Sequence, residues 1–119
     1  MRVRLIGIDA PENSQGADGA KAKAALTKLM PAGQPVRLQF DRRREDQYGR
    51  LLAYGWSGAT LVNEAMVAGG WTLAGIYPPN VMYTRRLEAA EESARERKAG
   101  MWATGGFSCR PADRRGRRC

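Results

Sequence analysis

The sequence predicts one small α+β domain, in which strand, helix, strand, strand, helix and helix follow one another. Three observations predict this class. Residues 2–8 form an apolar run, residues 35–41 alternate between apolar and polar side chains, and residues 81–99 carry one apolar helical stripe. A chain of 119 residues has the length of a single domain. We place this domain over residues 1–102 and expect disorder in the basic tail, residues 103–119, where Gly, Arg and Pro dominate.

The first strand, RVRLIGI over residues 2–8, is predicted to be buried on both faces, with Gly7 as a natural bend point. A loop rich in Pro, Asn, Ser and Gly follows over residues 11–16. Asp18 is then suited to cap a helix over residues 19–30. The apolar stripe of this helix consists of Ala22, Ala25, Leu26, Leu29 and Met30.

Residues 35–41 predict a half-exposed strand, because Val36, Leu38 and Phe40 alternate with polar side chains. A charged hairpin loop follows, and a second strand returns over residues 50–56. Next comes a short helix that Asn63 can cap and that ends at two glycines.

The last helix is predicted over residues 81–99, with an ion pair between Glu91 and Arg95 and with Gly100 as its end. Met101 and Trp102 then pack back onto the domain. Only three strands are clearly visible, and three strands make a poor barrel with two open edges.

Positive charge is spread over the whole chain. Twenty Lys and Arg oppose twelve Asp and Glu, which gives a net charge of +8, and residues 103–119 contribute half of it. The domain itself is therefore basic, which favours an anionic partner such as nucleic acid. Most of the cations are arginines, whose guanidinium groups can bind phosphate through two hydrogen bonds.

The chain contains no histidine. This excludes hydrolytic mechanisms with an imidazole base and zinc sites with a His ligand. The two cysteines, Cys109 and Cys119, both lie in the tail, where a disulfide and two free thiols are equally consistent with the sequence. We find no run long enough for a membrane span and no signal peptide. The compartment stays open, with a secreted or cell-envelope location expected if the natural N-terminus lies upstream.

Two carboxylates, Asp9 and Glu12, follow the first strand on either side of Pro11. Two acids on such a turn can bind a hard cation and position a water molecule, and the proline restricts the backbone between them. The alternative is an ordinary acidic loop that faces solvent.

Arg4 interrupts the apolar run, which is costly unless its charge meets an anion. It predicts either a phosphate contact or an ion pair with an acid such as Asp41. A straight strand would place Arg4 about 16 Å from Asp9. The strand must therefore bend, or the Arg4 side chain must lean along it, for the two residues to share a site.

Two loops offer further contacts for nucleic acid. In DQYGR, residues 46–50, Gly49 permits a tight turn, Arg50 leaves it in a fixed direction and Tyr48 can stack on a base. Tyr77, followed by two prolines, can form a second stacking wall. A polar hairpin tip and a stiff connector are the alternatives. The run Arg42, Arg43 and Arg44 reads as a solvated loop that would raise the local field for phosphate.

Taken together, these motifs resemble the staphylococcal nuclease (thermonuclease) family, in order and with nearly uniform spacing, over residues 3–102. They are VRLIGIDAPE, DQYGRLLAY, VNEAMVAGG, the Tyr-Pro-Pro-Asn loop, and EAAEESAR before Gly-Met-Trp. The resemblance implies a five-stranded OB-fold barrel with three helices and calcium-dependent hydrolysis of DNA and RNA.

The resemblance also implies roles for single residues. Arg4 and Arg50 resemble the two phosphate-binding arginines, and Glu12 resembles the general base that activates water. Asp9 resembles a Ca²⁺ ligand, and Ala10 stands where the family supplies a ligand through a backbone carbonyl. Tyr48 and Tyr77 stand where tyrosines of the family flank the nucleotide.

The sequence departs from the family pattern at its N-terminus, because Met1 stands where the third strand of the family starts. We therefore expect an OB-fold domain that lacks two strands and one calcium carboxylate, and we expect a monomer. Strand donation by a second chain is the alternative. Gly75 also stands where some members carry another tyrosine. The leading function is a calcium-dependent nuclease. The alternative is an inactive OB-fold module that binds nucleic acid.

Overall fold

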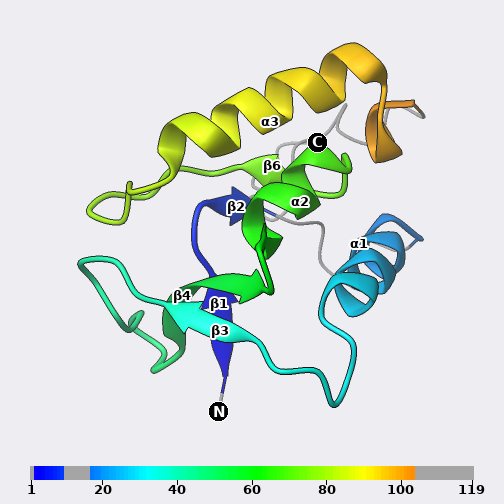
Figure 1. Cartoon of the computed structure of the whole chain (residues 1–119). Coiled ribbons are helices and arrows are strands. Elements are labelled where there is room, and N and C mark those ends of the chain that lie inside the picture. The colour runs from blue at the N-terminus through cyan, green and yellow to red at the C-terminus, as the bar shows by residue number, and fades with distance from the viewer. Residues whose placement is uncertain (1, 10–16, 104–119) are drawn as a thin grey trace.

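The computed structural model describes residues 2–9 and 17–103 (Figure 1). The strands are β1 (Val3–Leu5), β2 (Ile8–Asp9), β3 (Arg37–Gln39), β4 (Leu51–Ser57), β5 (Thr60–Leu61) and β6 (Leu73–Ala74). The helices are α1 (Ala17–Leu29), α2 (Val62–Ala68), α3 (Thr84–Arg97) and the short 3₁₀ helix η2 (Gly100–Ala103). In Figure 1, α2 lies between α3 and the sheet of β1, β3 and β4, and α1 lies to one side.

Strand β4 is the centre of the main sheet. It pairs in parallel with β1 and antiparallel with β3 and β5, whereas β2 and β6 form a separate antiparallel pair. Three helices with mixed sheets confirm the α+β class. Within residues 2–9 and 17–103 the main sheet is open rather than a closed barrel. Barrel closure and the lack of two strands stay predictions.

The first strand is not continuous, and the prediction that it is buried on both faces is wrong. Strand β1 ends at Leu5 and β2 starts at Ile8, with Gly7 between them at φ +78°. Val3 is 38% exposed. Gly7 is thus the bend that the sequence indicated, and only glycine suits it. The positive φ of Gly7 would strain any residue with a side chain, and a Cβ at this position would also collide with the side chain of Leu87.

Asn63 does not cap α2, as the sequence predicted, because the helix already starts at Val62. Its side chain is completely buried. Its Nδ2 donates to the carbonyl of Ile6 at 2.7 Å, and its Oδ1 accepts from the amide of Gly55 at 2.9 Å. Asn63 therefore satisfies the backbone at the β1–β2 bend and in β4, which join the sheet to α2.

Helix α1 begins at Ala17, so Asp18 lies inside the helix and is not its cap. Its predicted stripe is confirmed. Ala22 is buried in the main core, and the other stripe residues pack against it. This core joins all three helices with β2 through Ile8, Ala22, Val62, Met66, Val67 and Leu87. Among the described residues, no helix has the length and apolar character needed to cross a membrane.

Helix α3 is shorter than predicted, because it starts at Thr84 and is capped by Lys98 in the left-handed conformation. Glu91 accepts a hydrogen bond from the amide of Ala74 at 3.0 Å, and no salt bridge with Arg95 occurs in the described part of the chain. Met101 is 1% exposed and packs on Leu73, which confirms the predicted anchor after the helix. The predicted basic tail lies outside the described residues from position 104 onward.

Asp41 connects the end of β3 to the segment before α3. Its carboxylate accepts hydrogen bonds from the Tyr54 hydroxyl at 2.7 Å and from the amides of Met82 and Arg42. Partial burial opposes its charge, but these hydrogen bonds prevail and hold the pKa of Asp41 below its ordinary value. Burial and the hydrogen bond to Asp41 in turn raise the pKa of Tyr54.

Replacing Asp41 with Asn is expected to lower the free energy of unfolding by about 1–3 kcal/mol at pH 7, because the charged acceptor is lost. Since the pKa of Asp41 is depressed in the folded state, its contribution is complete above the ordinary value of 3.8 and disappears as the pH falls through the folded-state pKa. Urea unfolding at pH 7 and at low pH measures this. An equal difference between wild type and Asp41→Asn at both pH values would contradict the assignment.

Candidate active site

The sheet register brings Arg4 and Arg50 together. Arg4 pairs with Leu52 in the parallel β1–β4 ladder, and Arg50 precedes Leu52 by two residues. Side chains two residues apart point to the same face of a strand, and extending this alternation to Arg50, the residue just before β4, puts both arginines on one face. A strand spacing of about 4.8 Å and two residues of rise place their Cα atoms about 8 Å apart.

A tight turn fixes the direction of Arg50. Oδ1 of Asp46 accepts from the amides of Tyr48 and Arg50 at 2.9 Å, and Gly49 adopts φ +75°. The other carboxylate oxygen, Oδ2, accepts from Nε of Arg50 at 2.6 Å. Although burial opposes the charge, the bonds to Arg50 and Tyr48 hold the pKa of Asp46 below its ordinary value. The terminal nitrogens of Arg50 make no hydrogen bond to the described residues, and they are the groups that can meet an anion.

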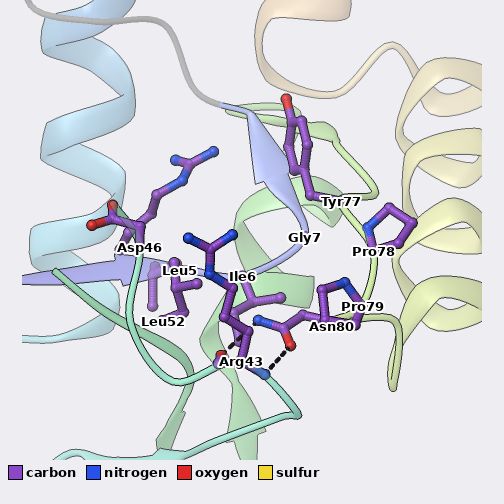
Figure 2. Close-up of a pocket in the computed structure, with 11 residues that line it drawn as sticks. Leu5, Ile6, Gly7, Arg43, Asp46, Leu52, Tyr77, Pro78, Pro79 and Asn80 are labelled. Carbon is purple, nitrogen blue, oxygen red and sulfur yellow. Dashed lines mark hydrogen bonds between the residues drawn. The ribbon is translucent and has the colours of Figure 1, made fainter. Parts of the chain in front are cut away.

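A cleft of about 190 Å³ lies beside these arginines. Asp46 and Tyr77 stand on opposite sides of it, and Arg43 rises between them (Figure 2). Its lining combines cations with apolar and aromatic walls. The lining residues are Arg4, Leu5, Ile6, Gly7, Arg43, Asp46, Leu52, Tyr77, Pro78, Pro79 and Asn80. Arg50 is not part of the lining, but its partner Asp46 is.

Asn80 fastens the two loops of the cleft to each other. Its Oδ1 accepts from the amide of Arg43 and its Nδ2 donates to the carbonyl of Arg43, both at 2.8 Å (Figure 2). Asn80 is only 5% exposed, and its pair of hydrogen bonds satisfies the backbone N–H and C=O groups of Arg43. The Arg43 side chain is held in turn by its Nε, which donates to the carbonyl of Glu45 at 2.8 Å.

Tyr77 and Asp9 meet at Gly75. A Cβ on Gly75 would lie 3.1 Å from the Tyr77 ring and 3.3 Å from Cβ of Asp9. Because Gly75 has no side chain, the Tyr77 ring, which lines the cleft, can lie beside buried Asp9. Strand β2 holds Asp9 there by pairing it with Leu73 of β6.

Arginine stacks on aromatic rings around the cleft. The guanidinium carbon of Arg4 lies 5.8 Å from the centre of the Tyr77 ring, and that of Arg50 lies 5.6 Å from the centre of the Tyr48 ring. Both rings are more than half exposed, at 52% for Tyr77 and 64% for Tyr48. Stacking orders a guanidinium group while its N–H edge stays available to phosphate.

The predicted site residues separate into groups. Arg4, Arg43 and Tyr77 line the cleft, while Asp9, Arg50 and Tyr48 adjoin residues that line it. The guanidinium carbon of Arg44 lies 4.3 Å from the centre of the Phe40 ring, and Arg42 is exposed. The three consecutive arginines therefore do not share one role. Arg4 does not pair with Asp41, whose partners are described above. Glu12 and Ala10 lie outside the described residues.

Sequence reasoning missed Asp46 and Asn80 as parts of the site. A signal for Asp46 was present, since Asp four residues before Arg across a glycine turn is suited to bond both the turn and the guanidinium. No local pattern distinguishes Asn80 from an ordinary loop residue, because its partner Arg43 lies 37 positions away.

Of the predicted calcium ligands, Asp9 alone lies among the described residues. Its carboxylate oxygens are of the type that Ca²⁺ prefers, and it lies beside the cleft. The described part of the chain contains no group of three or more acidic, His or Cys side chains that could hold a metal ion. The other predicted ligand, the backbone carbonyl of Ala10, follows Asp9 directly in the sequence and lies outside the described residues.

Comparison with known proteins agrees with these features. The chain is 39% identical over 105 residues to the thermonuclease of Staphylococcus intermedius, which covers 85% of this chain and 62% of that protein. It is 36% identical over 107 residues to the thermonuclease of Staphylococcus hyicus, covering 87% and 63%. It is also 30% identical over 112 residues to endonuclease YncB of Bacillus subtilis, covering 88% and 53%.

The chain thus spans about three fifths of the length of these thermonucleases. The model of a family described as staphylococcal nuclease homologues matches residues 2–104. That span contains β1, the Asp46–Arg50 turn, the Tyr77–Asn80 loop and all three helices. The chain belongs to the staphylococcal nuclease family.

Proposed function

We propose that this chain is a calcium-dependent nuclease that hydrolyses phosphodiester bonds of DNA, RNA or both. The observation that carries the proposal is the parallel register of β1 and β4, which sets Arg4 and Arg50 on one face of the sheet beside an open cleft. Two neighbouring guanidinium groups match the charge and geometry of a phosphodiester. The nuclease names of the relatives support the same reaction class.

In this proposal Arg4 and Arg50 bind the phosphate and stabilise the negative charge that grows on its oxygens during attack. The carboxylate of Asp46 orients Arg50 through Nε, so that the terminal nitrogens of Arg50 face the substrate. The exposed rings of Tyr48 and Tyr77 flank the nucleotide, and Arg43 adds positive charge inside the cleft.

Glu12 acts as the general base that accepts a proton from the attacking water. The bend at Gly7 and the β2–β6 pairing support this role, because they hold Asp9, three residues earlier, near Tyr77 of the cleft. Asp9 and the carbonyl of Ala10 would hold Ca²⁺, which would act as a Lewis acid on a phosphate oxygen when bound. We further propose an OB-type barrel and a monomer.

A cleavage assay with labelled single-stranded DNA and RNA tests the proposal. We expect cutting by the purified chain with Ca²⁺ and none when EDTA replaces it. Circular dichroism with a thermal melt shows that the protein is folded in both conditions. A folded chain that binds the oligonucleotide but does not cut it at any Ca²⁺ concentration would contradict the nuclease proposal and would favour the non-catalytic binding module.

A further inference from the structure

A second cluster of arginine and aromatic side chains lies on the same face of the sheet as Arg4 and Arg50. We call it the Trp56 cluster, and it consists of Arg37, Trp56, Tyr83 and Arg86. Arg37 pairs with Trp56 across the β3–β4 ladder, so their side chains share one face. Arg4 pairs with Leu52, four residues before Trp56 on β4, which is that same face. Four residues of strand separate the two sites by about 13 Å.

The Trp56 cluster is held in a fixed arrangement. Nε1 of Trp56 donates to Oε1 of Gln39 at 2.9 Å, and the hydroxyl of Tyr83 donates to the same oxygen at 2.8 Å. The rings of Trp56 and Tyr83 meet edge to face at 6.2 Å. Gln39 therefore holds the two rings through the same side-chain oxygen.

Two guanidinium groups stack on these rings, and they differ in their charge balance. Arg86 lies 5.9 Å from the Trp56 ring and is paired with the carboxylate of Glu64 through two hydrogen bonds of 2.8 and 2.9 Å. Arg37 lies 5.5 Å from the same ring, is exposed, and has no salt bridge within the described ranges. Arg37 therefore presents an ordered positive charge to solvent.

The segment Asn80–Met82 leads along the chain from the cleft to this cluster. Asn80 forms one wall of the cleft, and Met82 follows it two residues later. Met82 is 51% exposed, and its sulfur lies 3.7 Å from Nε2 of Gln39, the residue that holds Trp56. Val81 is 45% exposed beside it. Two exposed apolar side chains thus lie in the segment between the cleft and Arg37, an arrangement that suits the bases and a phosphate of one strand.

From this placement we propose that the Trp56 cluster is a second nucleic-acid contact, in which Arg37 binds a backbone phosphate of the strand whose scissile phosphate lies in the cleft. The proposal rests on the proposed nuclease function. A separation of about 13 Å corresponds to roughly two to four nucleotide steps, because one step rises ~3.4 Å in a stacked duplex and about twice that in an extended single strand. A dinucleotide in the cleft cannot reach Arg37, whereas a longer strand can.

The test compares the binding of fluorescent oligodeoxythymidylates of two and twelve nucleotides to the full chain in EDTA. We expect Arg37→Ala to weaken binding of the 12-mer about 3–10-fold at low salt and to reduce the slope of log K against log salt by about one. Binding of the dinucleotide should change less than twofold. Arg95→Ala is the matched control, because Arg95 is also an exposed arginine but lies far from the cluster. It stands on α3 about 15 Å along the helix from Arg85, the neighbour of cluster residue Arg86.

Equal weakening for both lengths, or an effect of Arg37→Ala on the 12-mer no larger than that of Arg95→Ala, would overturn the second contact. The two proposals fail in different ways. A chain that never cuts DNA but shows the length-dependent effect of Arg37→Ala refutes the nuclease and retains the contact. A chain that cuts with Ca²⁺ and binds the 12-mer independently of Arg37 retains the nuclease and refutes the contact.

Discussion

Replacing Arg50 with Lys is expected to lower kcat/KM for cleavage of single-stranded DNA by about 10²–10³-fold, the usual cost of removing one preorganised donor to a transition state. Lysine keeps the positive charge, but it lacks the planar fork that can bond Asp46 and a phosphate at the same time. Steady-state kinetics with a fluorogenic oligonucleotide measures the effect. The loss should appear in kcat, because the two hydrogen bonds strengthen as charge grows on the phosphate.

Arg95→Lys makes the same exchange on the exposed surface of α3 and should leave kcat and KM unchanged. Asp46→Asn provides a second comparison, since it removes the carboxylate that orients Arg50 while Arg50 itself stays. If Asp46 acts through Arg50, the double variant should lose little more activity than Arg50→Lys alone. Full additivity of the two losses, or an Arg50→Lys enzyme as active as wild type, would remove Arg50 from the proposed mechanism.

Replacing Glu12 with Gln is expected to reduce kcat by about 10²-fold or more while the chain still binds nucleic acid, because the amide cannot accept the proton of the attacking water. The structure supplies the indirect support that Asp9, three residues earlier, is buried next to Tyr77. Single-turnover cleavage and fluorescence anisotropy, measured on the same oligonucleotide, separate the chemical step from binding.

The control for Glu12 is Glu92→Gln, a change of an exposed acid on α3 that removes the same charge. It should affect neither binding nor cleavage by more than about twofold, as is usual for a surface substitution that contacts nothing. Parallel loss of binding and cleavage in Glu12→Gln would show that Glu12 holds the substrate or the ion and is not the base.

Local sequence patterns predicted the elements of the fold well where one residue type has a single use. Gly7 in an apolar run predicted the bend, and it has the positive φ that such a bend requires. The stripe of α1 and the anchor at Met101 were predicted from apolar spacing and are confirmed. The first residues of all three helices were less accurate, whereas α2 ends before Gly69, as its two glycines predicted.

Asn63 shows why local reasoning failed there. An Asn before an apolar helix is a typical cap, but here its amide serves two backbone groups in the interior. The gain from satisfying buried Ile6 and Gly55 exceeds that of a surface cap, and no sequence pattern reveals these partners, one of which is 57 positions away.

The candidate site was predictable as a set of residues but not as a geometry. The two arginines follow from their motifs, yet only the parallel β1–β4 register shows that they share a face. The antiparallel β3–β4 register places Arg37 and Trp56 on that face, which the prediction of β3 as a half-exposed strand did not indicate. The hydrogen-bonded side chains of Gln39 and Tyr83 cover part of the face of β3 that was expected to face solvent.

The central claim is that a phosphodiester binds between Arg4 and Arg50. NMR spectra of the arginine Nε–H groups, recorded while a non-cleavable dinucleotide is added, test it most directly. We predict that the signals of Arg4 and Arg50 shift together, with one dissociation constant that equals the inhibition constant of the dinucleotide in the cleavage assay. A dinucleotide that inhibits cleavage while it shifts other arginines and leaves these two unchanged would contradict the account.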